Sequence, residues 1–351
     1  MPILPLEVTD PRDQPPEAFL AWVERIGVDL VSARRALATI LGRGVHDRAA
    51  WGRDFQIPKR MTDRWPDLPR LTLEKTQTSS HDGFQKLLFR LSDGMAIETV
   101  LIPLHKPGAV SVCLSSQVGC AMGCVFCATS RMTNRRNLAT WEIIDQWMQA
   151  REVAASQGRR VTGAVFMGMG EPFLNYDRVL AAAELMRCSF GGSVAAKGIT
   201  ISTVGLVTEI DRFTQEARRF RLSISLGAAT DEKRAWLVPI ASKSPIRDVM
   251  AAAQRHVDAR GGRVMLSYVC IGGVNCFEED AKAIGELVGS MPVRFDLIEV
   301  TDPSGRFRPP DSAELKSFRD ALSHHLRQPI VRRYSGGADI QAACGTLAGG
   351  G

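Results

Sequence analysis

The sequence predicts an α/β protein whose parallel sheet forms an open or partial (β/α) barrel, preceded by a small helical domain. Three observations lead to this expectation. From residue 109 onward, short apolar runs alternate with helical patterns, and six or seven such units follow one another. Segments rich in cysteine, glycine and serine come directly after several of these runs. Because reactive groups gather at the carboxyl ends of barrel strands, these segments are the candidates for function.

The first 72 residues are expected to form a helical accessory domain with its linker, and residues 73–351 the barrel domain. Apolar side chains recur at helical spacing between residues 19 and 26. Ser32 is expected to cap a second helix, which stops at a glycine ten residues later. The stretch 50–72 is rich in Pro, Arg and Asp and is predicted to be a linker or loose end.

A β-hairpin is predicted to follow. Its arms cover residues 84–91 and 95–102, and they are joined at Asp93-Gly94, a dipeptide that suits a tight two-residue turn. Glu98 falls on the face of the second arm that otherwise carries apolar side chains. We therefore expect its carboxylate in apolar surroundings, where desolvation raises the pKa of an acid.

The remaining elements are predicted by their hydrophobic patterns. The expected barrel strands cover residues 109–114, 161–167, 198–203, 220–225, 263–270, 293–299 and 330–333. Helical patterns between them include residues 141–154, 176–186 and 246–257, and Asp311 begins a capping box with Glu314.

Composition excludes several classes of protein. The 351 residues are 45% hydrophobic and 23% charged, which suits one large or two modest globular units and not a disordered or fibrous chain. No apolar run reaches the roughly 18 residues that span a bilayer, and the acidic start lacks secretory features, so we expect a cytoplasmic protein. Eight cysteines are too few for a disulfide scaffold. A net charge of +6, with bunched arginines, leaves nucleic-acid binding open.

The most informative motif is Cys120, Cys124 and Cys127, which follows the first barrel strand. Thiolates spaced by three and then two residues can hold three corners of an iron–sulfur cube and leave the fourth iron open to a small ligand. A structural zinc site normally supplies four ligands. A zinc knuckle or a set of buried thiols remains the alternative from spacing alone.

The cysteine spacing resembles that of the radical S-adenosylmethionine (SAM) superfamily. The resemblance implies that SAM fills the open corner of a 4Fe-4S cluster, and that electron transfer into its sulfonium yields a 5′-deoxyadenosyl radical. In that superfamily a Gly/Glu motif after the second strand binds the amino group of SAM, which matches Gly170 and Glu171. The resemblance also makes three segments after later strands candidates for SAM contacts: Ser202, then Ser225-Leu226-Gly227, and Thr301. Without the cysteines, these would be ordinary residues at strand ends.

A more specific resemblance covers the chain from about residue 84 to its end. Residues 113–120, the cysteine triad, residues 168–172 and the tail 339–349 together resemble the RlmN/Cfr family of radical SAM RNA (adenine) methyltransferases. This implies methylation of an adenine ring carbon, C2 or C8, in 23S rRNA or tRNA, with two SAM molecules per turnover. It further implies RNA as a partner, an electron donor such as flavodoxin or ferredoxin, and a monomer.

The resemblance assigns roles to three residues outside the cluster motif. Cys344 is methylated by one SAM, and the radical from the second removes hydrogen from that methyl group, so that the methylene radical adds to adenine. Glu98 accepts the proton that leaves the ring carbon. Cys113 then breaks the enzyme–base crosslink by attacking sulfur, as in thiol–disulfide exchange. Cys188, Cys270 and Cys276 match nothing catalytic and are interpreted as packing or surface residues.

Two positions depart from the family pattern. Gly227 stands where the family usually has His, and Thr301, followed by Asp302, stands where an Asn is expected to reach SAM. Cofactor contacts have therefore changed, and a diverged substrate is left open, while the cluster motif and both catalytic cysteines are retained. A radical SAM enzyme acting on a peptide or small molecule remains an alternative, as does a non-catalytic iron–sulfur or zinc RNA-binding module.

Overall fold

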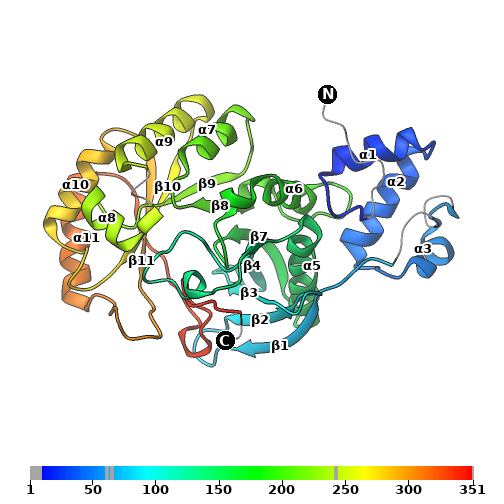
Figure 1. Cartoon of the computed structure of the whole chain (residues 1–351), viewed down its shortest axis with the longest axis horizontal. Coiled ribbons are helices and arrows are strands. Elements are labelled where there is room, and N and C mark those ends of the chain that lie inside the picture. Colours follow the sequence, from blue (N-terminus) through cyan, green and yellow to red (C-terminus); the bar gives the residue numbers. More distant parts are fainter. Residues whose placement is uncertain (1–9, 60–62, 64–66, 241–243, 350–351) are drawn as a thin grey trace.

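The computed structural model describes residues 10–59, 63, 67–240 and 244–349. A curved ten-stranded sheet forms its centre, in the order β1-β2-β3-β4-β7-β8-β9-β10-β11-β12 (Figure 1). The first three strands pair antiparallel, and β3 is antiparallel to β4, whereas β4 to β12 run parallel to their neighbours. The predicted partial (β/α) barrel is thereby confirmed.

The strands agree closely with the predicted runs. Their bounds are β1 Thr72–Thr78, β2 Gln85–Arg90, β3 Ala96–Pro103, β4 Ala109–Cys113, β7 Arg160–Phe166, β8 Ile199–Thr203, β9 Arg221–Ser225, β10 Val264–Cys270, β11 Val293–Glu299 and β12 Ile330–Arg332. A separate small sheet pairs β5 (Gln117–Val118) with β6 (Arg136–Asn137).

Helices cover the outer face of the parallel strands (Figure 1). They are α5 Thr140–Ser156, α6 Tyr176–Arg187, α7 Val207–Gln215, α8 Asp231–Leu237, α9 Ile246–Arg260, α10 Glu278–Val288 and α11 Ser312–Leu326. The capping box predicted at Asp311 is confirmed, since its carboxylate accepts from the Glu314 N–H while the Glu314 side chain accepts from the Asp311 N–H. No helix among the described residues is long and apolar enough to cross a membrane.

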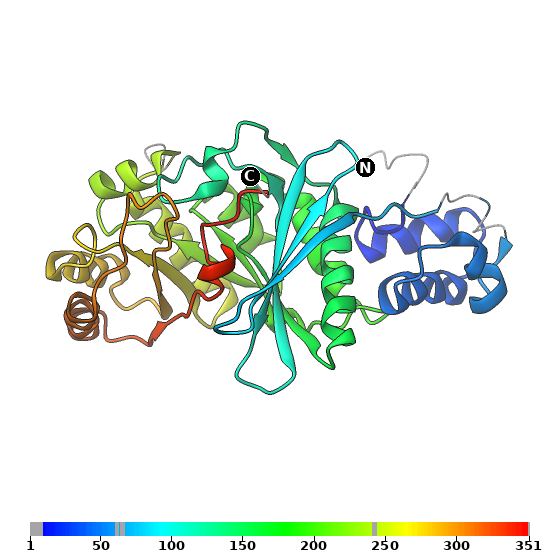
Figure 2. The ribbon, with the colours of Figure 1, turned by 90° about the horizontal axis from the view of Figure 1, so that it is seen from below.

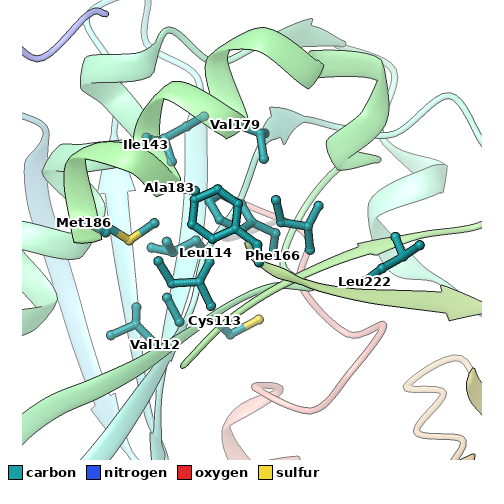
Figure 3. Close-up of a cluster of buried hydrophobic side chains, with 14 of the residues drawn as sticks. Val112, Cys113, Leu114, Ile143, Phe166, Val179, Ala183, Met186 and Leu222 are labelled. Atoms are coloured by element: carbon teal, nitrogen blue, oxygen red, sulfur yellow. The ribbon is translucent and has the colours of Figure 1, made fainter. Parts of the chain in front are cut away.

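Apolar side chains between the sheet and α5 and α6 form part of the core. Figure 3 shows Val112 and Phe166 packed toward Ile143 of α5 and Met186 of α6. Successive side chains of a strand point to opposite faces, so Cys113 is turned away from Val112 and toward the inside of the barrel. The alternation therefore separates a structural face of β4 from the face that carries its cysteine.

The N-terminal helices lie at one end of the molecule, beside α5 and α6 (Figure 1). They are α1 Pro16–Arg25, α2 Leu30–Leu37, which continues as a π-helical turn over Ala38–Gly42, and α3 Arg48–Phe55. The predicted cap at Ser32 is wrong: Asp29 caps α2 and accepts from the Ser32 N–H at 2.8 Å, so the helix begins three residues earlier.

The predicted linker is also partly wrong. α3 occupies its first residues because Asp47 caps a new helix, accepting from the Ala49 N–H at 2.8 Å. At the other end β1 begins at Thr72 and extends the hairpin to three strands. β1 is mostly exposed and carries almost no apolar alternation, so only its pairing with β2 identifies it as a strand.

Candidate active site

A cavity lies at the carboxyl ends of the parallel strands. Its walls come from the loop after β4, from the ends of β7 to β11 and from the C-terminal tail. Among the predicted site residues, those that line it are Cys120, Cys124, Cys127, Gly170, Glu171, Ser202, Ser225, Gly227 and Cys344. Residues up to 224 positions apart in the sequence are thus brought to one cavity, as expected for a barrel whose strands all end at the same side.

The three loop cysteines face this cavity, and each thiol affects the pKa of its neighbours electrostatically. Burial raises the pKa of Cys120 to about 12, with a smaller contribution from the neighbouring Cys127 thiol. Burial likewise raises the pKa of Cys124 and of Cys127. Thiols that oppose one another's ionisation become thiolates when they bind a cation, because the metal charge reverses the balance. The set therefore has the donor chemistry of a metal cluster.

The number and kind of these ligands suit an iron–sulfur cluster. Cluster sites are held by cysteine thiolates, and three thiols leave one iron open, whereas a structural zinc site closes with four ligands. Three thiols around an open cavity fit the 4Fe-4S cluster that the motif predicts.

Glu171 is buried at the bottom of the Gly168–Glu171 turn. Its Oε1 accepts from the Phe173 N–H at 3.0 Å and its Oε2 from the Val204 N–H at 2.9 Å. Burial raises its pKa to about 7, against the opposing effect of these two donors. The turn requires glycine, because a Cβ on Gly170, whose φ is +103°, would lie 2.6 Å from the Gln117 side chain.

Gly227 has a structural reason for replacing a larger residue. Its φ is +74°, and a Cβ there would lie 2.8 Å from Cγ2 of Val238. A histidine would need both a different backbone and a displaced Val238. This departure from the family pattern is therefore built into the loop after β9.

Two predicted SAM contacts, Leu226 and Thr301, do not line the cavity. Leu226 is buried, and its carbonyl accepts from Nε of Arg234 at 3.0 Å. Asp302, the alternative to Thr301, also lies off the wall, because its carboxylate accepts from Arg131 at 3.2 Å and organises its own turn. The end of β11 contributes the preceding residues, 298–300, to the wall instead.

Sequence inspection missed Arg234, which is buried beneath the site. Its guanidinium donates to the carbonyls of Leu226, Ser244 and Val204 at 3.0, 2.8 and 2.7 Å, and thus ties together the loops that follow β8 and β9. Its charge also acts on the Cys124 thiol. Nothing in Asp231-Glu-Lys-Arg234 distinguishes it from an exposed helical residue.

Cys113 and Cys344 meet in a second, smaller cavity beside the first. Both line it, together with Met167 and Arg333, and Cys344 lines both cavities. All eight cysteines of the chain lie in its described part and are free thiols. Burial raises the pKa of Cys113 to about 12, the Cys344 thiol adds to the rise, and the Arg333 charge opposes it.

Figure 2 shows the C-terminal tail that carries Cys344, in red, and carbonyl groups of its backbone hold it in place. The carbonyl of Gly345 accepts from the Ala128 N–H at 2.7 Å, and that of Leu347 accepts from the Thr129 hydroxyl at 2.6 Å. Both donors belong to the segment that follows Cys127. The cysteine loop and the tail therefore position each other.

Glu98 lies under the same tail, and its expected apolar surroundings are wrong. The carboxylate is buried but pairs with Nζ of Lys86 at 2.9 Å, and it accepts from the N–H groups of Ala348 and Gly349 at 2.8 and 3.1 Å. Lys86 reaches it because β2 pairs Leu88 with Glu98, which puts Lys86 diagonally opposite on the same face. Glu98 lines neither of the two cavities described above.

Comparison with known proteins identifies the family. The radical SAM superfamily model matches residues 114–286. A "probable RNA methyltransferase" of Anaeromyxobacter sp. strain Fw109-5 is 46% identical, with coverage of 93% of this chain and 96% of the relative. A "dual-specificity RNA methyltransferase RlmN" of Anaeromyxobacter dehalogenans strain 2CP-C is 34% identical, with coverage of 99% and 94%.

A solved structure agrees with these relatives. The crystal structure of a radical SAM methyltransferase from Sphaerobacter thermophilus superposes with a TM-score of 0.87 at 35% identity, covering 96% of this chain and 98% of that one. Fold and sequence thus agree over nearly the whole length. The chain belongs to the radical SAM family of RNA methyltransferases that includes RlmN.

Proposed function

We propose that this protein methylates an adenine ring carbon, C2 or C8, in RNA through an S-methylcysteine on Cys344. The observation that carries the proposal is the position of Cys344, which lines one cavity with the three loop cysteines and a second with Cys113. A methyl carrier must meet both the cofactor and the thiol that later releases it. One residue at the boundary of two cavities meets this requirement.

The proposed cofactors are one 4Fe-4S cluster and two SAM molecules per turnover. Cys120, Cys124 and Cys127 hold the cluster, which with SAM supplies the methyl group and the carbon radical that the reaction needs. Gly170 and Glu171 bind the amino group of SAM. Ser202, Ser225 and Gly227 complete its site on the cavity wall.

The chemistry of adenine explains why a cysteine carrier is needed. A ring carbon at C2 or C8 has no lone pair with which to attack a sulfonium methyl group, so the new bond is made by a carbon radical on the Cys344 sulfur. The radical formed on addition gives up one electron to the redox system that supplied it, Glu98 takes the ring proton, and the adduct is then a thioether between Cys344 and the base. The Cys113 thiolate attacks the Cys344 sulfur and forms a disulfide as the S–CH₂ bond breaks; the methylene carbon keeps the bonding electron pair and takes up a proton to become the product methyl, and an external thiol later reduces the disulfide.

The described structure corresponds to a resting state of this cycle. The Glu98 carboxylate is occupied by Lys86 and by two tail N–H groups, and the Cys113 thiol is buried. Both groups become available only when the tail leaves its contacts. Release of the tail therefore belongs in the cycle, after Cys344 has been loaded.

The target is proposed to be an adenosine of 23S rRNA or tRNA. Within one genus, the chain is more identical to the relative called a probable RNA methyltransferase than to the one called RlmN, 46% against 34%. This difference and the altered position Gly227 are reasons to test both RNAs. A cytoplasmic monomer reduced by a flavodoxin or ferredoxin completes the proposal.

The first test concerns the carrier. After anaerobic reconstitution with iron and sulfide, the protein is incubated with SAM alone and its peptides are analysed by mass spectrometry. We expect one methyl group on the Cys344 peptide and none in Cys344→Ala. If the protein cleaves SAM while Cys344 stays unmethylated, the result would favour a radical SAM enzyme that acts on a peptide or small molecule.

The second test concerns the crosslink and the target. Cys113→Ala should accumulate protein bound covalently to RNA, the added change Cys344→Ala should abolish the adduct, and Cys188→Ala serves as the matched control thiol. Absence of an adduct in Cys113→Ala would contradict the role of Cys113. RNA from a strain that lacks the gene should, after digestion, lack one methyladenosine that wild-type RNA contains. Whether the missing nucleoside is the 2-methyl or the 8-methyl isomer identifies the ring carbon that is methylated.

A further inference from the structure

A third cavity opens at the end of the barrel opposite the cysteine loop. Its volume is about 720 Å³, and its walls come from β4, from β7 to β12, from the residues that follow β12 and from the loop after β3. It shares no lining residue with the cavity that holds the proposed SAM contacts, but it adjoins the smaller cavity of Cys113 and Cys344, with which it shares Phe84, Ile102, Arg333 and Tyr334. The methyl-transfer chemistry proposed above assigns no role to its other lining residues.

The walls of this cavity are cationic. Five Lys or Arg side chains line it against two carboxylates, a net charge of +3 with histidine neutral. Two of the cations are already neutralised: Arg294 pairs with Asp296 at 2.8 Å and Arg332 pairs with Glu299 at 2.6 Å.

Of the other three cations, Lys197 precedes β8 and Arg221 begins the adjacent strand β9, so these two lie on neighbouring parts of the wall, whereas Arg333 follows β12, beyond β10 and β11. None of them makes an ion pair with any residue that the structure describes. Arg333 donates only to the Met167 sulfur, a weak acceptor. Unpaired cations around a concavity focus a positive potential into it and favour an anionic ligand.

Asp296 adds a second requirement at the inner wall. Its side chain is 1% exposed; Oδ1 accepts from Nε of Arg294 at 2.8 Å, but Oδ2 has no hydrogen-bond partner among the described residues. A buried carboxylate oxygen without a donor is costly. A ligand that brings a hydroxyl or amino group to Oδ2 is therefore favoured over a simple anion.

Tyr334 supplies an aromatic surface at the rim. The residue is 67% exposed, although its ring is held in place by an edge-on contact with Phe84, with centroids 6.0 Å apart, and by a hydrogen bond from its hydroxyl to Asp82 at 2.8 Å. A fixed, exposed aromatic face beside cations is the arrangement on which nucleic-acid bases stack.

We propose that this third cavity binds a nucleotide. The phosphate lies between Lys197 and Arg221, the base stacks on Tyr334, and a hydroxyl or amino group of the ligand donates to Asp296. A nucleotide combines a phosphate, a flat aromatic ring and a hydrogen-bond donor. Inorganic phosphate has no ring. The nucleotide is either free or one unit of an RNA strand that reaches this end of the barrel.

The test is calorimetric titration of the reconstituted full-length protein with the four nucleoside 5′-monophosphates. Because one of these could enter the SAM cavity, each titration is repeated with excess S-adenosylhomocysteine. We expect binding that the competitor does not alter. Lys197→Ala/Arg221→Ala and Tyr334→Ala should each weaken it at least tenfold, while the matched pair Lys75→Ala/Arg319→Ala, which removes two exposed cations elsewhere, leaves it unchanged.

Several results would overturn the proposal. The first is loss of nucleotide binding when S-adenosylhomocysteine is present, and the second is wild-type nucleotide affinity in the Lys197→Ala/Arg221→Ala variant. The third is an affinity for inorganic phosphate equal to that for the nucleotide. The last is that neither a mononucleotide nor labelled pentaadenylate RNA binds. If pentaadenylate binds at least tenfold more tightly than AMP, and the same variants weaken its binding, the natural ligand is a unit of an RNA strand. Otherwise the ligand is a free nucleotide. Thermal melting of each variant separates loss of the site from loss of the fold. These experiments measure nucleotide binding and not methyl transfer. A negative result therefore leaves the proposed methyltransferase function untouched, and failure of that proposed function would leave the nucleotide site untouched.

Discussion

Cys113 is predicted to be almost unreactive while the tail is in place. Burial and the Cys344 thiol raise its pKa to about 12. At pH 8 an ordinary thiol of pKa 9.0 is about one-tenth thiolate, whereas a thiol of pKa 12 is thiolate in about one molecule in ten thousand. Since the thiolate is the nucleophile, alkylation of Cys113 should be about a thousandfold slower than that of an ordinary thiol.

The assay is a timed reaction with iodoacetamide at pH 8 and at pH 9, with glutathione alongside as the ordinary thiol. Mass spectrometry follows the peptide that contains Cys113. Its alkylation should be slow, and should rise about tenfold between the two pH values because its pKa lies far above both. A truncated protein ending at residue 334 lacks the covering tail, and its Cys113 should approach the rate of glutathione.

Replacement of Arg333 sharpens the same test. Its charge lowers the pKa of Cys113, so Arg333→Met should slow alkylation further, whereas Arg333→Lys should retain most of the wild-type rate. Alkylation of wild-type Cys113 as fast as glutathione, or a rate that levels off near pH 9, would refute the reasoning. The resolving thiol would then need no tail movement.

Three other predictions concern buried charges. In cluster-free protein, the pKa of Glu171 is about 7 in the folded state against 4.5 in the unfolded state. Its contribution to stability is therefore complete below pH 4.5 and is lost as the pH rises through 7. Urea titrations should show that the free energy of unfolding of Glu171→Gln, relative to that of the wild type, grows by about 3 kcal/mol across this range. Lys86→Met leaves buried Glu98 without its cation and should cost about 3 kcal/mol, unless Glu98→Gln is added. Arg12→Met removes the nearer of the two cations beside buried Asp145, leaving Arg70 at 3.9 Å, and it also removes the partner of Asp10 at 2.7 Å. It should likewise destabilise the fold, and a loss below about 1 kcal/mol in urea unfolding would show these ion pairs to be unimportant.

The elements that bury apolar side chains were predictable from the sequence. All seven parallel strands and the capping box at Asp311 follow from hydrophobic runs and local capping rules. β1 was not predictable, because its exposed Thr, Glu, Lys and Gln residues carry no burial pattern and its strand form depends on pairing with β2. The two errors near the N-terminus, Ser32 and the linker, both arise from aspartates that cap helices slightly outside the expected positions.

The candidate site was predictable where it depends on strand ends and not where it depends on distant contacts. The cysteines, Gly170, Glu171, Ser202 and Ser225 reach one cavity because parallel strands end together. The ion pair of Glu98 required knowledge of the register between β2 and β3. The burial of Arg234 required knowledge of three separate loops.

The tail contacts set the free energy that a substrate must supply. Four hydrogen bonds hold the segment after Cys344: two from the cysteine loop to carbonyls of the tail and two from tail N–H groups to Glu98. At about 1 kcal/mol each, their release costs on the order of 4 kcal/mol, or about a thousandfold in affinity. A ligand shifts such an equilibrium only by its preference for the released state, and specific protein–DNA binding exceeds nonspecific binding by about 4 kcal/mol or more, so a nucleic acid can supply this much. Under the proposed function, an RNA that binds only the released tail would free Glu98 and uncover Cys113 in the same step, which would couple the proposed proton acceptor and the proposed resolving thiol to the presence of their substrate.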